Sequence, residues 1–139
     1  MEAKQPAAAV GAHAVLDLAI ASRYAGCYVV TLSVDQVNFC QPIHVGELVT
    51  FLASVNYAGR SSMEIGIKVI TEDIREKSVR HTNSCFFTMV AVDDQGKPTA
   101  VPQLPLGSAD EKRRFLQAQQ RRQIRQELEQ RYQALQLEP

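Results

Sequence analysis

Two short polar clusters stand out because their side chains and amides suit the binding of phosphate. The segment Gly59, Arg60, Ser61 and Ser62 combines a glycine, two hydroxyls and a positive charge. Glycine lets a ligand approach the backbone closely, and an arginine can hold phosphate through paired hydrogen bonds. From the residues alone, an ordinary turn between two strands is favoured over an anion site, which stays open as the alternative.

The second polar cluster, Arg80-His-Thr-Asn-Ser, begins a run that is otherwise apolar. Its members Arg80 and Thr82 carry groups that can contact phosphate or the polar arm of a nucleotide ligand. His81 has no nucleophile beside it in the sequence, and a lone histidine is more often structural than catalytic. This cluster therefore predicts binding rather than acid–base chemistry.

The chain offers few groups for catalysis. None of the histidines at positions 13, 44 and 81 stands in a metal-ligand spacing, so no metal site is expected. Serine-hydrolase, phosphate-loop and dinucleotide motifs are absent from the sequence, and no cofactor is expected. A carboxylate remains, and Asp17 is the only one in the segment predicted to form the first helix.

The composition limits the classes of partner. The chain has 139 residues, of which 45% are hydrophobic, so it can bury the core of one domain. Fifteen basic and 15 acidic residues cancel, and neither nucleic acid nor a membrane is an expected partner. The three cysteines form no CxxC pair, which favours reduced thiols and a cytoplasmic location.

The periodicity predicts one helix followed by four antiparallel strands. We expect the helix over residues 10–25, with Gly26 as its carboxyl-terminal cap. From Tyr28 onward, apolar residues recur at every second position, as in a strand. The phase of this alternation changes near residues 35–36, which indicates a β-bulge. A hairpin at 75–78 leads into a strand with apolar residues of both parities, which is typical of the centre of a sheet.

The middle strands predict the core, because their apolar residues alternate in phase. Glu64 and Lys68 are expected to point away from it. The residues expected to be buried are Val49, Phe51, Val55, Met63, Ile65, Ile67, Phe87 and Met89. One helix and four such strands indicate an α+β architecture, with the helix wrapped by the sheet.

The carboxyl-terminal tail is predicted to be a separate long helix. A capping box at residues 108–111 opens it, and few helix breakers follow before Pro139. About 30 helical residues span about 45 Å, far beyond the roughly 14 Å radius of gyration of such a chain. We therefore expect domains at 1–107 and 108–139. The apolar stripe Ile124, Leu128, Tyr132 and Leu135 favours contact with a neighbour over a solvated helix.

Four motifs carry a resemblance to a known family, and they agree with it in order and spacing. They are Thr31-Leu-Ser-Val-Asp-Gln-Val-Asn-Phe, Pro42-Ile-His-Val-Gly-Glu, Gly59-Arg-Ser-Ser-Met-Glu and Arg80-His-Thr-Asn-Ser-Cys-Phe-Phe-Thr. The chain resembles the bacterial cytosolic acyl-CoA thioesterases of the hotdog-fold superfamily, relatives of the brain acyl-CoA hydrolase. The resemblance implies a central helix wrapped by an antiparallel sheet, and protomers that join as a dimer or a trimer of dimers.

The resemblance also implies roles for particular residues. It places the segment 59–62 near the coenzyme A pocket, and a catalytic aspartate on the central helix. Counting without gaps puts that aspartate at Ala14, whereas the helix carboxylate here is Asp17. Asp17 either takes over the role or is an unrelated solvated residue. The family's first strand and asparagine loop exceed what residues 1–9 can supply, so this part is expected to be missing or divergent.

These observations predict an acyl-CoA thioesterase that hydrolyses fatty acyl-CoA to free fatty acid and coenzyme A, in fatty acid metabolism. Water activated by Asp17 would attack the thioester while amides at the helix amino terminus hold the oxyanion. The alternative is an impaired or truncated hotdog subunit that binds acyl-CoA or only assembles. A third hypothesis is an interaction protein whose basic segment at 121–125 meets an acidic partner.

Overall fold

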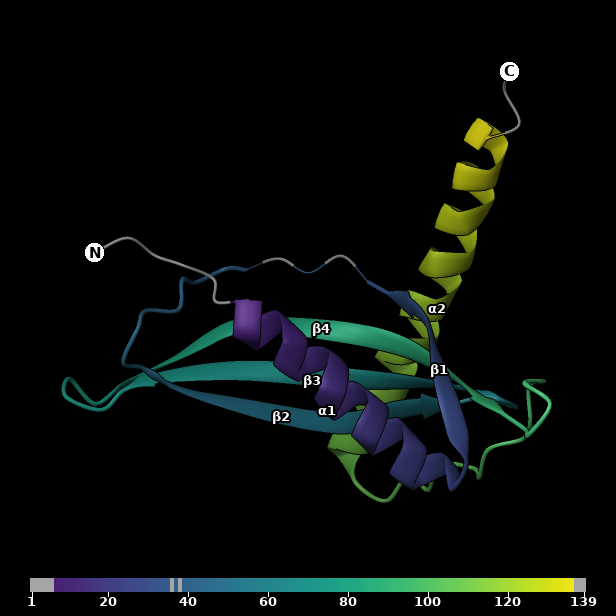
Figure 1. Ribbon diagram of the computed structural model, residues 1–139, viewed down its shortest axis with the longest axis horizontal. Coiled ribbons are helices and arrows are strands. Elements are labelled where there is room, and N and C mark those ends of the chain that lie inside the picture. The colour runs from purple at the N-terminus through teal and green to yellow at the C-terminus, as the bar shows by residue number, and fades with distance from the viewer. Residues whose placement is uncertain (1–6, 36, 38, 137–139) are drawn as a thin grey trace. The chain divides into compact units, whose positions relative to one another are not determined.

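The computed structural model describes residues 7–35, 37 and 39–136, and in the first helix it describes the side chains from Leu16 onward. Figure 1 shows the order of the helices and strands along the chain. The chain divides into two compact units, residues 1–103 and 104–139. We describe each unit by itself.

The first unit begins with helix α1 (Ala7–Ala25), which is rich in alanine, the residue with the highest helix propensity. It ends where predicted. Gly26 adopts a positive φ of 70°, and its amide donates to the carbonyl of Ser22 at 2.9 Å. This is the usual carboxyl-terminal cap, because glycine reaches that conformation without strain.

Four antiparallel strands form one sheet. They are β1 (Tyr28–Val34), β2 (Leu48–Ala58), β3 (Ser62–Asp73) and β4 (Ser78–Val92), in the spatial order β1-β4-β3-β2. The prediction that β4 is central is confirmed, since it pairs with both β1 and β3. In Figure 1, α1 lies across one face of this sheet, and it contacts all four strands. The predicted α+β fold is therefore confirmed.

The core lies between α1 and the sheet. Met63, Ile65 and Ile67 of β3 and Met89 of β4 are at most 1% exposed. Phe87 is also buried, as predicted. The remaining predicted core residues, Val49, Phe51 and Val55, are only half-buried, because β2 is an edge strand of the sheet.

Two local predictions need correction. The bulge of β1 lies between Thr31 and Ser33, so the phase changes before residues 35–36; β1 ends at Val34, and Gln36 lies outside the described residues. Glu64 alternates with Met63 and Ile65 and so points away from α1, but its side chain is buried. There it accepts a hydrogen bond from Asn56 Nδ2 at 3.2 Å.

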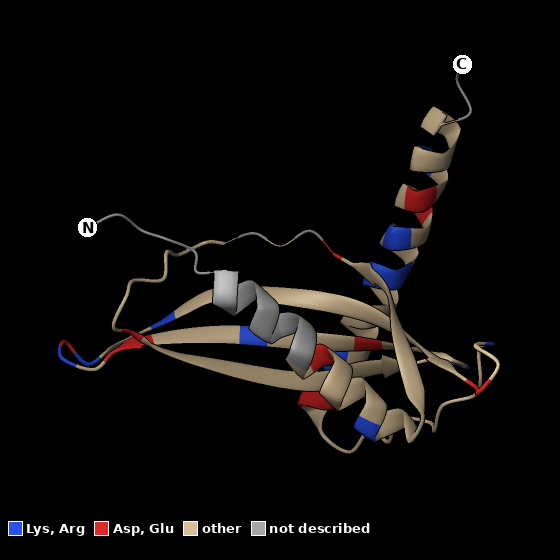
Figure 2. Cartoon of the chain, viewed as in Figure 1, with Lys and Arg blue, Asp and Glu red and all other residues tan. Residues whose placement is uncertain are grey.

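The second unit contains helix α2 (Ala109–Gln136), and its capping box is confirmed in part. The Glu111 amide donates to Ser108 Oγ at 3.1 Å, but the Glu111 carboxylate accepts from the amide of Gly107 and not from that of Ser108. Basic and acidic residues both occur along α2, whereas the strands of the sheet are mostly uncharged (Figure 2). The predicted stripe on α2 is exposed at Ile124, Leu128, Tyr132 and Leu135.

Candidate active site

Asp17 of α1 is the candidate catalytic group, and it faces the core. Its residue is 1% exposed, and neither carboxylate oxygen has a hydrogen-bond partner among the described residues. Loss of hydration on burial raises its pKa from 3.8 to about 7. A carboxyl group that titrates near neutral pH can both accept and return a proton there, which is what a general base requires.

Cys85 of β4 lies close enough to Asp17 for the two groups to interact electrostatically. Burial, and to a smaller extent the negative charge of Asp17, raise the pKa of the Cys85 thiol to about 12. The thiol is therefore neutral at physiological pH and is not an activated nucleophile. Of these two neighbours, only Asp17 can exchange a proton near pH 7.

The predicted phosphate-binding segment is the tight hairpin between β2 and β3. The amide of Gly59 donates to the carbonyl of Ser62 at 2.8 Å, and a Cβ at position 59 would stand 3.1 Å from Ser62 Oγ. The carbonyls of Arg60 and Ser61 accept from Val101 and Ala91, which fixes the hairpin beside the end of β4. The Arg60 side chain is exposed and can reach a ligand in solvent.

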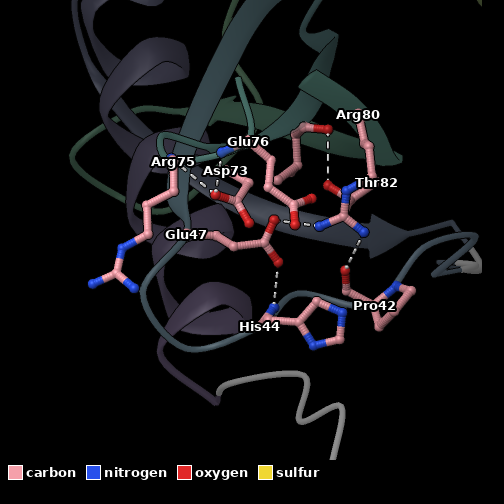
Figure 3. A network of polar contacts seen from close by, with 9 residues as sticks. Pro42, His44, Glu47, Asp73, Arg75, Glu76, Arg80 and Thr82 are labelled. Carbon is pink, nitrogen blue, oxygen red and sulfur yellow. Dashed lines mark hydrogen bonds and ion pairs between the residues drawn. The ribbon is translucent and has the colours of Figure 1, made fainter. Parts of the chain in front are cut away.

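The second predicted binding group, Arg80 and Thr82, is engaged within the chain. Arg80 forms an ion pair with Glu47, and its other guanidinium nitrogen donates to the carbonyl of Pro42 at 3.3 Å (Figure 3). Thr82 is fully buried, and its hydroxyl donates to the carbonyl of Val69 at 3.0 Å. The Arg80 contacts fasten the loop that precedes β2 onto the start of β4, whereas the Thr82 hydroxyl joins β4 to β3.

Glu47 is the acidic centre of that loop. One of its oxygens pairs with Arg80, and the other accepts from the amide of His44 at 2.7 Å (Figure 3). The hydrogen bond from Arg80 is the main reason that the pKa of Glu47 is lowered. The loop is therefore held by a charged contact that is strongest when Glu47 is ionised.

The candidate residues lie along the sheet and not in one cluster. In the β3–β4 register Ser62 pairs with Val90, whereas Thr71 pairs with Arg80. Nine residues of strand separate Ser62 from Thr71, a distance of about 30 Å. Asp17 lies between these ends, next to Cys85, which pairs with Ile67. Within one chain, therefore, the hairpin and Arg80 are at opposite ends of the sheet.

Two polar residues on the same face as Asp17 are absent from the prediction made from the sequence. Asn83 is 1% exposed and Thr71 is 0% exposed, and their side-chain polar atoms have no hydrogen-bond partner among the described residues. The apolar alternation along β4 could have predicted the inward position of Asn83, because Asn83 is an even number of residues from Phe87 and Met89. A polar residue at an inward position of a central strand marks a place that needs explanation.

No three His, Cys, Asp or Glu side chains gather into a possible metal site in the part of the chain that the structure describes. His81 Nε2 lies 2.9 Å from Ser84 Oγ and 3.0 Å from the carbonyl of Asn83. The side chain of His13 lies outside the described residues. Over those same residues, no helix has both the length and the apolar character that crossing a membrane requires.

Comparison with known proteins identifies the family. Residues 9–78 match the model of the thioesterase superfamily, so the chain belongs to that superfamily. A crystal structure of an apo-hexameric acyl-CoA thioesterase superposes with a TM-score of 0.80 and 33% identity, over 88% of this chain and 79% of that one. This match and the sheet with its central helix define a hotdog fold, as the resemblance implied.

Two relatives in sequence are similar over most of this chain. Protein VdlD of Helicobacter pylori is 52% identical over 104 residues, 75% of this chain and 59% of that protein. The cytosolic acyl coenzyme A thioester hydrolase of Rattus norvegicus is 36% identical over 98 residues, 69% of this chain and 26% of that protein. The chain thus spans less than two thirds of the length of either relative.

Proposed function

We propose that the protein is an acyl-CoA thioesterase that hydrolyses fatty acyl-CoA to free fatty acid and coenzyme A. The observation that carries the proposal is the buried carboxyl group of Asp17, whose pKa is raised to about 7 on the sheet-facing side of the helix. A chain of the thioesterase superfamily with such a group has a base suited to activate water near neutral pH.

In the proposed reaction, the carboxylate of Asp17 accepts a proton from a water molecule whose oxygen bonds to the thioester carbonyl carbon. The carbonyl oxygen becomes an oxyanion. Its collapse breaks the carbon–sulfur bond, and the departing thiolate takes the proton back from Asp17. Fatty acid and coenzyme A result, and Asp17 returns to its starting state.

The oxyanion needs a hydrogen-bond donor, and the start of α1 is a poor source. Asp17 is ten residues beyond Ala7, where α1 begins, so about 15 Å of helix separates it from the first free amides. A donor must stand about 3 Å from the oxyanion. We therefore propose that the hydrogen-bond donor to the oxyanion lies on the sheet and not at the amino terminus of α1.

For coenzyme A, we propose binding at the hairpin of Gly59, Arg60, Ser61 and Ser62, with Arg60 contacting phosphate. Arg80 and Thr82 remain predicted contacts, but Arg80 lies at the other end of the sheet and both side chains have partners within the chain. They would meet the same ligand only across a contact between two copies.

A homo-oligomer, as a dimer or trimer of dimers, is part of this proposal. Its support is the hexameric relative and the four exposed apolar side chains on the edge strand β1. These side chains are Tyr28, Val30, Leu32 and Val34. Exposed apolar side chains on an edge strand mark interaction surfaces. A cytoplasmic location is proposed by analogy with the rat enzyme, which is named as cytosolic.

The deciding experiment is hydrolysis of acyl-CoA esters from short to long acyl chains, followed by release of the coenzyme A thiol. Hydrolysis that is lost in Asp17→Asn supports the proposal. Binding of the esters without turnover would instead favour an impaired subunit, an alternative motivated by the distance of Asp17 from the helix amino terminus. The third hypothesis, an interaction protein, predicts no affinity for coenzyme A at all.

A further inference from the structure

Three buried polar side chains, one on α1 and two on the sheet face toward α1, have no hydrogen-bond partner among the described residues. They are Asp17, Asn83 and Thr71. An unsatisfied buried polar group costs about 1–3 kcal/mol, and native proteins contain few of them. Two further such atoms, on His44 and Thr88, belong to residues that are only half-buried. Asp17 interacts with Cys85, and Asn83 is two residues from Cys85 in β4, so these two side chains indicate a place prepared for a polar ligand. Thr71 lies further along the sheet, beyond Val69 in the register.

The strand register places Asn83 on the same face of the sheet as Cys85, the residue that interacts with the candidate base. Ile67 pairs with Cys85 and Val69 with Asn83, and directly paired residues of an antiparallel sheet share a face. Cys85 interacts electrostatically with Asp17, so this is the face toward α1. Asn83 is the neighbouring inward residue of β4, two positions before Cys85 and about 7 Å from it along the strand.

A β-bulge fixes the position of Asn83. The register shifts between Val69 and Ile70 of β3, where β4 carries the additional residue Thr82. The Thr82 hydroxyl donates to the carbonyl of Val69 at 3.0 Å, and its own carbonyl accepts from the amide of Cys40 at 3.1 Å. Both contacts hold the bulge in place. Bulges are frequent beside active sites because they redirect a neighbouring side chain.

We propose that Asn83 is a catalytic residue whose side-chain amide donates a hydrogen bond to the thioester carbonyl oxygen and to the oxyanion that forms from it. The inference rests on the proposed thioesterase function. Asn83 can act here because its Nδ2 group has two N–H donors that nothing described in the chain occupies. It is also in water-poor surroundings, where a fixed donor stabilises developing charge most strongly.

The test compares two variants that each remove one unpartnered polar group from this face. Asn83→Leu removes the proposed donor, whereas Thr71→Val removes a hydroxyl that lies further from Cys85, beyond Val69 in the register. We expect Asn83→Leu to lower kcat for a butyryl or longer acyl-CoA about 10²–10³-fold with little change in KM. Thr71→Val should keep its kcat within about twofold of the unmodified protein.

Thermal unfolding of both variants separates a catalytic role from a structural one. Neither melting temperature should fall, because each variant loses an unsatisfied polar group from the interior. If Asn83→Leu does not fold, Asn83→Ala provides the same kinetic comparison. A lower melting temperature with unchanged kcat, or an equal loss of kcat in Thr71→Val, would overturn the assignment of Asn83.

The experiment also separates this inference from the proposed function. If the unmodified protein hydrolyses acyl-CoA and Asn83→Leu hydrolyses it equally well, the inference fails and the thioesterase function stands. If the unmodified protein hydrolyses none of the esters, both fail. A selective loss of kcat in the Asn83 variants supports both.

Discussion

Replacing Asp17 by asparagine should stabilise the protein in a pH-dependent way while removing its activity. The carboxyl group is 1% exposed and unpartnered among the described residues, and burial raises its pKa from 3.8 to about 7. A raised pKa in the folded state means that folding favours the protonated form. The native protein therefore loses stability as the pH rises from about 4 to about 7, and it regains none at higher pH.

The size of this effect follows from the pKa. Each unit corresponds to about 1.4 kcal/mol, so a rise from 3.8 to about 7 makes the ionised group cost about 4 kcal/mol of folding free energy at pH 8. At pH 5 the folded carboxyl is protonated, and the cost is less than half as large. Asparagine cannot ionise. The stability of Asp17→Asn relative to the unmodified protein should therefore increase by about 2.5 kcal/mol when the pH is raised from 5 to 8.

Thermal unfolding at pH 5 and pH 8, at a fixed protein concentration, measures this difference. A gain of about 2.5 kcal/mol corresponds to a melting temperature difference on the order of 10 °C for a chain of this size. The matched control is Asp94→Asn, at an exposed aspartate, which should show no such dependence on pH. In the same samples, Asp17→Asn should lower turnover at least about 10²-fold and leave coenzyme A affinity nearly unchanged.

An Asp17→Asn variant whose stability relative to the unmodified protein is the same at both pH values would refute the argument from burial. The carboxyl would then be hydrated or paired in solution. Full turnover in a variant with the expected stability profile would show that Asp17 is buried without being the base.

Three other predictions test the binding hairpin, the loop and the assembly. Arg60→Ala should weaken coenzyme A binding about 10-fold or more, and by less at high salt, because it removes a charge-assisted contact. Unchanged affinity in calorimetry would show that the nucleotide binds at another place. Glu47→Gln should cost about 1–2 kcal/mol of stability at neutral pH, and this difference should disappear as the pH falls through the lowered pKa of Glu47, as denaturant unfolding can measure. Light scattering at micromolar concentration should give a dimer or a hexamer, and a monomer would contradict the proposed assembly.

The sequence was enough to predict the helix, the four strands and the central position of β4. Those predictions depend on local properties: alanine content and Gly26 for the helix, and alternation for the strands. The bulge of β1 was misplaced because a change of parity shows that an additional residue exists, but not which pairing across the sheet accommodates it. Glu64 was expected to point away from the core, and it is nevertheless buried because it has a partner on the neighbouring strand, Asn56.

The site was less predictable, because it depends on contacts between residues far apart in the sequence. Arg80 is attractive as a phosphate ligand until the fold brings Glu47 beside it, 33 residues earlier in the chain. Asn83 looked like one polar residue within a polar motif, and only the register shows that it shares a face with Cys85. The raised pKa of Asp17 likewise comes from its surroundings and not from its neighbours in sequence.

The position of Asp17 determines where its partner must lie. Three residues turn an α-helix by about 300° and advance it by about 4.5 Å, so a carboxylate at position 17 keeps nearly the same face as one at position 14. Asp17 and Ala21, one turn apart, are both fully buried, whereas Leu18 is 47% exposed, so the sheet-facing side of α1 includes position 17. If the base is at position 17 and not at position 14, the hydrogen-bond donor to the oxyanion must also lie further along this face. Because the donor must stand on the part of the sheet near Cys85, an inward residue of β4 meets the requirement, and Asn83 is the polar residue there.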